Sequence, residues 1–498
     1  MKRSAGILCP IFSLFGSNGI GDFSLSTKFF IKYIREIGFK YLQILPLSKI
    51  GLGNSPYMSE SGFAGNELYI STDFLTEQGL LEKDRAKDYV YNGNPYKVDY
   101  AFAKETAKKL LDAAFLNIND EWTEKTNRFA ANNKYWLDDY ALYKALQEYY
   151  KADSFLDFPK EARLRDKQTI ANFSAVLKDR IFYYKFIETL FYYNWQDIKT
   201  YANSIGVKII GDMPFYLSAT ACEIWAKKEF FAVDKHFIPK KVAGVPPDYF
   251  NPKGQKWGNA LYDYDAMRCD DFRYLRKKYD YQLQLFDVLR IDHFRAFDSY
   301  FTIDGKAADG TKGVWKKGIG REFLPALIKK YGKERFIAED LGCAFGKVQE
   351  LVQSVNIPPM RVFQFGFDGS DNEHLPHNYS NDTVVYSGTH DNNTSLGWLY
   401  SLDDATRIKV LEYLDYADKY WGLGGRDNTS VKCIIRRLLA SSAGLVIFPI
   451  QDVLGFGEDT RYNTPGVAEG NWTYRITPDN LEDIDEKFLR DEIAAFFR

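Results

Sequence analysis

The sequence predicts an α/β protein whose core is a (β/α)₈ barrel. The first observation is that short apolar runs alternate with helical patterns along the chain, as parallel βα units do. The second is that three of the later runs end in acidic residues, which a barrel gathers at the mouth where its strands end. The eight apolar runs occupy residues 6–13, 41–47, 207–212, 285–292, 336–339, 361–367, 383–387 and 444–449.

The first helix shows how the elements are recognised. After the first apolar run, Phe30, Tyr33, Ile34 and Ile37 recur at helical spacing, and Gly38 ends the pattern before the second run. Read in this way, residues 1–498 form a single catalytic barrel. We expect largely helical insertions at the face where the strands end.

Two intervals are too long for simple crossovers. We expect residues 75–195 to form a helical insertion subdomain, in which an aromatic helix at 182–193 packs inside the protein. We expect residues 213–284 to form a second insertion with an active-site loop, because Pro and Gly punctuate its aromatic residues. Those aromatics are Tyr249, Phe250 and Trp257, which we predict to bind ligand from the loop. The alternative is that they pack to anchor it.

Composition excludes several classes of partner. The chain has 65 Lys and Arg against 67 Asp and Glu, a net charge of −2, and no basic run, which argues against nucleic acid. No apolar run approaches the ~20 residues of a membrane span. The aromatic content of 16% fits a carbohydrate site as well as a large core.

The cysteines and the N-terminus bear on the compartment. The five cysteines are odd in number and scattered, so we expect neither a disulfide framework nor a zinc site, and we predict a reducing cytoplasm. The N-terminal apolar stretch imitates a signal peptide. It contains Pro10 and lacks a small-x-small cleavage site, so we interpret it as the first barrel strand.

The fourth apolar run ends in an Arg, an Asp and a His. Strand side chains alternate, so Arg290 and Asp292 point the same way, about 6.5 Å apart. The guanidinium would hold the carboxylate ionised, as a covalent nucleophile requires. A purely structural ion pair is the alternative, because such pairs also perturb carboxylates.

Two further runs have the same layout. Glu339 ends the fifth run, 47 residues after Asp292. His390 and Asp391 follow the seventh run, and Asp391 lies 52 residues after Glu339. We therefore expect three acids to meet in one pocket. Carboxylates at strand ends also hold Mg²⁺ in some barrels, but Arg290 beside Asp292 disfavours a cation, and we predict no metal and no other cofactor.

Several longer motifs occur in order along the chain, namely 54–57 (NSPY), 211–214 (GDMP), 243–250 (AGVPPDYF), 290–295 (RIDHFR), 338–342 (AEDLG), 375–379 (LPHNY), 388–392 (GTHDN) and 451–453 (QDV). By these motifs and their order the chain resembles the amylomaltase type of 4-α-glucanotransferase, in the α-amylase superfamily. The resemblance runs through almost the whole chain. Just after Asp212 the chain departs from the family pattern, because Ala219, Thr220 and Ala221 replace an acidic residue and a Ser.

The resemblance implies a role for each matching residue. Asp292 would be the nucleophile, Glu339 the general acid/base and Asp391 the stabiliser of the transition state. Tyr57, Asp212, Trp257, Arg290 and His390 would line the donor and neighbouring subsites, with Tyr249 and Phe250 over the cleft. For His390 a purely structural hydrogen-bonding role is the alternative.

The implied reaction is retaining transfer of an α-1,4-glucan segment to an acceptor glucan or glucose. Retention requires two carboxyl groups only ~5–5.5 Å apart, which we predict for Asp292 and Glu339. Burial should raise the pKa of Glu339 so that it can donate a proton. Two other hypotheses stay open, namely an α-glucan hydrolase of the same superfamily and a catalytically silent glucan-binding protein.

Overall fold

The structure is a computed structural model that describes residues 2–247, 251–342, 345–467 and 469–498. Its centre is an eight-stranded parallel sheet in the order β10-β11-β12-β1-β2-β3-β6-β9, which confirms the predicted (β/α)₈ barrel. Each of the eight strands lies in one of the eight predicted apolar runs or overlaps it. The strands are β1 (Ser4–Leu8), β2 (Tyr41–Gln43), β3 (Lys208–Met213), β6 (Val288–Ile291), β9 (Phe336–Ala338), β10 (Met360–Val362), β11 (Val384–Tyr386) and β12 (Leu445–Pro449).

The barrel closes between β9 and β10. A parallel bridge joins Ala338 to Pro359, and the Ala338 amide donates to the carbonyl of Pro358 at 2.9 Å. Asp340, directly after Glu339, accepts from the Met360 amide at 2.9 Å and pairs with the Arg361 guanidinium. The closure therefore fixes the segment that carries Glu339.

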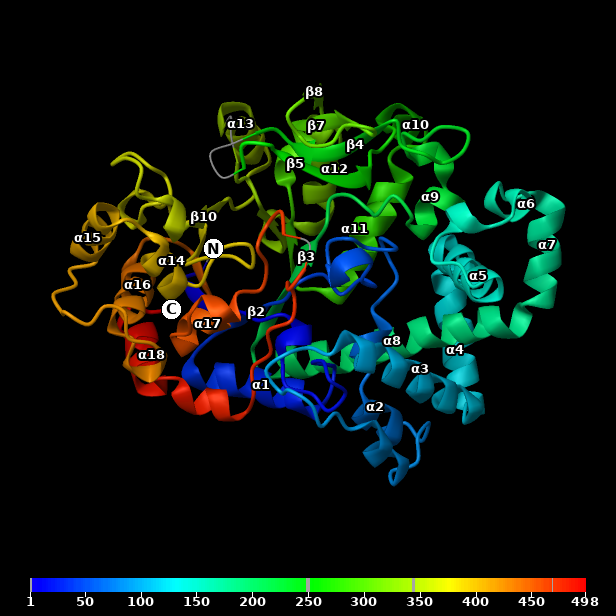
Figure 1. Ribbon diagram of the computed structural model, residues 1–498, viewed down its shortest axis with the longest axis horizontal. Helices are drawn as coiled ribbons and strands as arrows, with labels where there is room; N and C mark the ends of the chain where they lie inside the picture. Colours follow the sequence, from blue (N-terminus) through cyan, green and yellow to red (C-terminus); the bar gives the residue numbers. More distant parts are fainter. Residues whose placement is uncertain (1, 248–250, 343–344, 468) are drawn as a thin grey trace.

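Helices surround this barrel and extend it to one side (Figure 1). The first, α1, has the predicted buried face of Phe30, Ile34 and Ile37, and it ends at Gly38, whose φ of 122° suits glycine. The helices are α1 (Leu25–Ile37), α2 (Thr72–Glu77), α3 (Tyr100–Leu116), α4 (Asp120–Asn132), α5 (Lys134–Tyr150), α6 (Lys160–Arg163), α7 (Lys167–Val176), α8 (Lys178–Ser204), α9 (Cys222–Ala226), α10 (Tyr264–Cys269), α11 (Arg273–Leu285), α12 (Gly320–Tyr331), α13 (Phe345–Val355), α14 (Ser395–Ser401), α15 (Asp404–Tyr413), α16 (Thr429–Ala440), α17 (Ile450–Leu454) and α18 (Glu486–Ala495).

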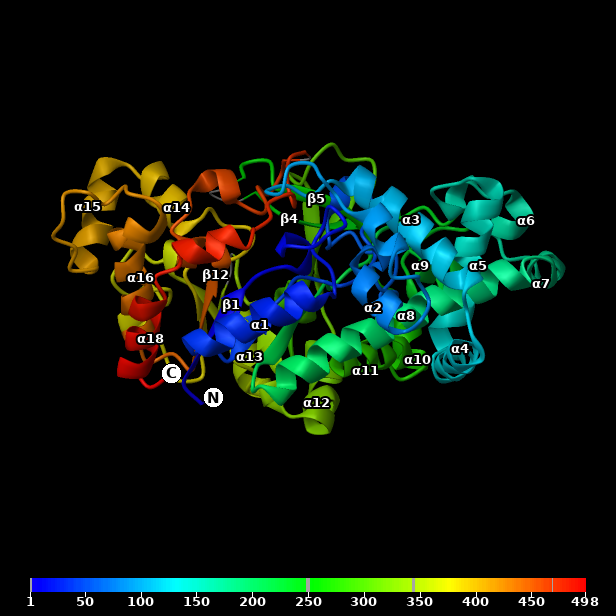
Figure 2. The ribbon, with the colours of Figure 1, turned by 90° about the horizontal axis from the view of Figure 1, so that it is seen from below.

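The interval between β2 and β3 is largely helical and holds α2 to α8. The longest helix in the described part of the chain, α8, has 27 residues and buries Tyr183, Phe186 and Phe191 of the predicted aromatic stretch at 182–193. Its C-terminal half runs beside α1 on the outside of the barrel (Figure 2). It thus links the insertion to the barrel.

The interval between β3 and β6 differs from the expectation. In the insertion at 213–284, where the sequence analysis expects an active-site loop with aromatic residues, the chain forms β4 (Lys241–Val245) and β5 (Gln255–Ala260). They join β7 (Ser299–Asp304) and β8 (Gly313–Lys317) in an antiparallel sheet, in the order β5-β4-β7-β8. Pro and Gly in this interval read as turn signals, and β4 pairs with β7 at a separation of more than 50 residues. Local sequence patterns therefore do not reveal these strands. Trp257 therefore lies on a strand and not on a loop.

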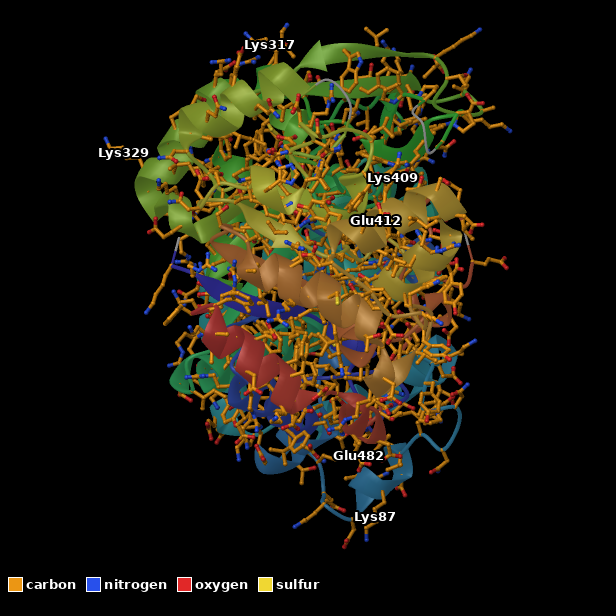
Figure 3. All side chains as sticks on the ribbon, turned by 90° about the vertical axis from the view of Figure 1, so that its left-hand side faces the viewer. Lys87, Lys317, Lys329, Lys409, Glu412 and Glu482 are labelled. Atoms are coloured by element: carbon orange, nitrogen blue, oxygen red, sulfur yellow. The ribbon has the colours of Figure 1, made fainter. Side chains whose placement is uncertain are left out.

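Small residues permit close packing at the strands that carry the site. A Cβ at Gly211 would lie 2.2 Å from the ring of Phe286, so only glycine lets this ring cover β3 next to Asp212. Charged side chains such as Lys329, Lys409 and Glu482 project from the outside (Figure 3). In the described part of the chain no helix is long and apolar enough to cross a membrane.

Candidate active site

An ion-pair network joins the ends of β3 and β6. The two strands place Asp212 directly opposite Arg290. Nη1 of Arg290 donates to both carboxyl oxygens of Asp212, at 2.7 and 2.8 Å, and to Oδ1 of Asp292 at 3.0 Å. The side chains of Arg290 and Asp212 are 5% and 0% exposed, whereas that of Asp292 is 26% exposed. Asp292 is thus the member of the network that a ligand can reach.

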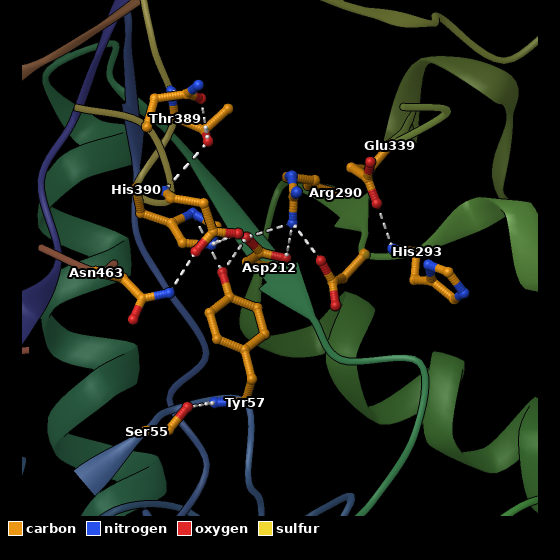
Figure 4. A network of polar contacts seen from close by, with 12 residues as sticks. Ser55, Tyr57, Asp212, Arg290, His293, Glu339, Thr389, His390 and Asn463 are labelled. Carbon is orange, nitrogen blue, oxygen red and sulfur yellow. Dashed lines mark hydrogen bonds and ion pairs between the residues drawn. The ribbon is translucent and has the colours of Figure 1, made fainter. Parts of the chain in front are cut away.

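Tyr57 and His390 adjoin this network at Asp212 (Figure 4). The Tyr57 hydroxyl donates to Oδ2 of Asp212 at 2.9 Å and lies 3.4 Å from Nδ1 of His390. The two rings stack at 5.0 Å with an interplanar angle of 19°. Arg290 and Tyr57 both donate hydrogen bonds to the buried Asp212 carboxylate, so this carboxylate orients both side chains.

Glu339 follows β9 and is held by backbone amides. Its Oε2 accepts from the His293 amide at 2.6 Å, and its Oε1 accepts from the Leu341 amide at 3.2 Å. His293 has a φ of 49°, in the left-handed region, and this turn aims its N–H at Glu339. Burial raises the pKa of Glu339 to about 8, against the attraction of Arg290 and with help from the charge of Asp292. The carboxyl group is therefore protonated at neutral pH, the direction that the sequence analysis predicts.

Asp391 lies two residues beyond Thr389, in the segment that follows β11. Asn463 donates to its Oδ1 at 2.6 Å, and Nε2 of His390 lies 3.4 Å from its Oδ2. Burial works against ionisation here, but His390, Asn463 and Arg290 together hold the pKa of Asp391 well below its usual range. With its side chain 49% exposed, Asp391 is an accessible and permanently ionised carboxylate.

A buried carboxylate braces the segment that carries His390 and Asp391. Asp452 in α17 accepts from the Ser387 hydroxyl at 2.5 Å, and from the Ser395 amide and hydroxyl at 2.7 Å each. Ser387 directly follows β11 and Ser395 begins α14. These three bonds pin both ends of the segment to α17.

The predicted aromatic residues have different outcomes. Trp257, half-buried on β5, donates to Oε1 of Gln255 at 3.1 Å, and its ring meets the His293 imidazole edge-on at 4.8 Å. It therefore reaches the segment next to Asp292 and Glu339. Tyr249 and Phe250 lie outside the described residues.

The described contacts thus connect most of the predicted site residues. Tyr57, Asp212, Asp292 and Arg290 form one network, which His390 extends to Asp391. Among the residues that the structure describes, no group of three or more His, Cys, Asp or Glu side chains is arranged to hold a metal ion.

Sequence reasoning missed several partners. No local pattern marks Asn463, an ordinary polar residue in a long loop. The role of the His293 amide is equally hidden, because a backbone group has no signature. The motif at 451–453 was a usable signal for Asp452.

A parallel barrel whose strand ends carry carboxyl groups in opposite protonation states is the architecture of an enzyme that cleaves or transfers glycosides. The family model described as 4-alpha-glucanotransferase, glycoside hydrolase family 77, matches residues 9–481. The chain is 36% identical over 501 residues to the 4-alpha-glucanotransferase of Aquifex aeolicus, covering 100% of this chain and 99% of that one. It is 35% identical over 471 residues to that of Clostridium butyricum, covering 93% and 94%.

A solved structure agrees with these sequence matches. The amylomaltase from Streptococcus agalactiae in complex with acarbose matches with a TM-score of 0.94 at 32% identity, over 100% of both chains. The chain therefore belongs to the 4-alpha-glucanotransferase family. It is an enzyme of the glycosyltransferase type.

Proposed function

We propose that this chain transfers a segment of α-1,4-glucan from a donor maltooligosaccharide to the 4-hydroxyl of an acceptor glucan or glucose, with retention of configuration. The observation that carries the proposal is the contrast between Asp292, which contacts Arg290, and Glu339, whose pKa burial raises to about 8. One carboxylate and one carboxylic acid are what the first step needs. The acarbose complex of the S. agalactiae amylomaltase supports a glucan-like ligand.

In the first step the Asp292 carboxylate attacks the anomeric carbon. Arg290 holds Oδ1, so Oδ2 is the attacking atom. The new carbon–oxygen bond forms as the glycosidic bond breaks, and Glu339 gives its proton to the departing oxygen, which leaves a covalent glucosyl-aspartate. Burial raises the pKa of Asp292 above its usual value, a net direction opposite to the one expected from its contact with Arg290, although Arg290 and His390 both favour the ionised form.

In the second step the roles of acid and base reverse. Glu339, now a carboxylate, removes the proton of the acceptor 4-hydroxyl, whose oxygen attacks the anomeric carbon and releases Asp292. Two inversions at one carbon give net retention, for which the two carboxyl groups should lie ~5–5.5 Å apart. Transfer in place of hydrolysis requires an oriented acceptor and exclusion of water. We assign that task to Trp257, with Tyr249 and Phe250.

The remaining site residues stabilise the sugar. Asp391 and His390 would bind the 2- and 3-hydroxyls, and these bonds strengthen as the ring flattens toward an oxocarbenium ion. Tyr57, stacked on His390, would face the sugar ring, while Asp212 holds Tyr57 and Arg290 in place. No metal or cofactor enters this scheme. The scattered cysteines support a cytoplasmic location for the reaction.

The test is incubation of the protein with maltotriose and no added metal, with products resolved by chain length and new reducing ends titrated. Asp292→Asn is assayed beside the wild type. The proposal predicts glucose and longer maltodextrins at a constant number of reducing ends, and no products with the variant. Rising reducing ends without longer products would instead make the chain a hydrolase. No reaction in the wild type would make it a binding protein.

A further inference from the structure

Lys278 is a buried cation that the proposed reaction does not use. It lies on α11 and is 2% exposed. Its ammonium donates to the carbonyl of Pro214 at 2.9 Å, to the carbonyl of Phe215 at 3.4 Å and to the Tyr262 hydroxyl at 3.4 Å. All three acceptors are uncharged. Burying an ammonium group among neutral acceptors costs several kcal/mol, so the position calls for a compensating charge or role.

The two carbonyls belong to the chain that leaves the end of β3. Pro214 and Phe215 directly follow Met213, whose own carbonyl accepts the backbone N–H of Asp292 at 3.2 Å. The Tyr262 hydroxyl also donates to Phe215, at 2.7 Å. Lys278 thus clamps the segment that supports the Asp292 backbone.

The charge of Lys278 also acts on the site. Burial lowers the pKa of Lys278 to about 8, opposed by the attraction of Glu223 and Asp292. Such attraction is reciprocal, so the ammonium favours ionised Asp292.

Lys278 is one of several cations around the network. Arg290 contacts two carboxylates, Asp212 and Asp292, and His390 also attracts the charge of both. The other charged group near Lys278 is Glu223 in α9, which accepts from Ser61 at 2.5 Å and from the Gly62 amide at 3.0 Å. Of the titratable hydroxyls, that of Tyr262 bonds to Lys278. The Tyr274 hydroxyl, from the same helix, lies with the aliphatic stem of Lys278 next to Gly62.

We propose that Lys278 is a positioning residue for the transfer reaction, because its ammonium fixes the chain after β3 and keeps a second positive charge near Asp292. This inference rests on the proposed role of Asp292 as nucleophile. Lys278 acts through Asp292 and through the backbone that supports it, without touching the substrate.

Three variants separate the charge of Lys278 from its hydrogen bonds. Lys278→Met removes both, Lys278→Gln keeps a neutral donor, and Lys278→Arg keeps the charge. Lys277→Met is the matched control, because Lys277 is the preceding residue of the same helix and is exposed. The measurement is the pH dependence of kcat/KM for maltotriose disproportionation, with thermal unfolding of every variant.

We expect Lys278→Met to lower kcat/KM about tenfold and to move the acid limb of the profile upward by about one pH unit, because Asp292 loses a stabilising charge. Lys278→Gln should show the same shift with a smaller loss of rate. Lys278→Arg and Lys277→Met should keep the acid limb of the wild type.

Two outcomes overturn the inference. One is an unchanged acid limb in folded Lys278→Met or Lys278→Gln. The other is loss of the fold in all three Lys278 variants while Lys277→Met folds, which would give Lys278 a purely structural role. Asp292→Asn is assayed in parallel. If it stays active, the proposed function itself fails; if it is inactive and the acid limb does not move, only the role of Lys278 fails.

Discussion

The ends of β9 and β11 have the same local layout, but the structure gives their acids opposite properties. At each of these two ends, a short apolar strand is followed within a few residues by a carboxyl group. Glu339 accepts hydrogen bonds from backbone amides, and burial together with the charge of Asp292 raises its pKa to about 8 against the attraction of Arg290. Asp391 has Asn463 and His390, which hold its pKa well below the usual range. The difference teaches that the surroundings, which include the adjacent His390 and the distant Asn463, decide which carboxyl group is protonated and which stays charged.

Replacing the acid at β9 should have the largest effect. Glu339→Gln cannot donate a proton, so kcat/KM for maltotriose should fall by about 10²–10⁴-fold. In the wild type Glu339 is protonated below pH about 8, so the rate should fall as pH rises through that value. The variant should lack this basic limb. Glu334→Gln, an exposed neighbour before the same strand, is the control, and a basic limb that persists in Glu339→Gln would refute the assignment.

Removing the cation between β3 and β6 should come next. Arg290→Met leaves Asp212 buried and unpaired, which should cost about 3–5 kcal/mol of unfolding free energy and lower kcat/KM by roughly 100-fold. The double variant Arg290→Met with Asp212→Asn should recover stability but not rate. Urea unfolding and initial rates measure both. Recovery of the rate in the double variant would show that Arg290 acts only on stability.

A change at the β11 end tests the other half of the comparison. Asn463→Asp replaces a donor with a like charge beside Asp391, so the pKa of Asp391 should rise and kcat/KM for maltotriose should fall about tenfold. Asn463→Ala, which removes only the hydrogen bond, should lower kcat/KM less. Equal losses in the two variants would contradict this account.

The smallest effects should come from His293, between Trp257 and Glu339. His293→Asn tolerates the left-handed backbone and keeps the N–H that bonds to Glu339, so kcat should change little. The variant loses the imidazole ring that Trp257 contacts, so the KM for acceptor glucose should rise a few-fold. His293→Val disfavours that backbone by roughly 1–2 kcal/mol and should weaken the bond to Glu339. Because this bond lowers the pKa of Glu339, the basic limb should move upward in His293→Val alone. Matching profiles for the two variants would exclude the coupling.

The elements that sequence reasoning found and those that it missed differ in the range of their interactions. Each barrel strand is a continuous apolar run buried on both faces, so its signal is contained in a few residues. The antiparallel sheet draws its strands from positions that turn residues interrupt. Its strand β4 pairs with the neighbouring β5 and also with β7, more than 50 residues further along the chain. A similar difference separates Asp292, Glu339 and Asp391, which follow barrel strands, from Asn463 and Lys278, whose partners lie far away in the chain.

The sequence by itself determined the barrel, the positions of the three acids at its strand ends, and the family, because these depend on local pattern and on the order of motifs. The tertiary structure decided the protonation of Glu339 and Asp391, the shared contact of Arg290 with two carboxylates, and the burial of Lys278. The physical reason is that a pKa is set by desolvation and by every nearby charge and hydrogen bond. Those neighbours come from strands, loops and helices far apart in the chain, and only folding brings them together.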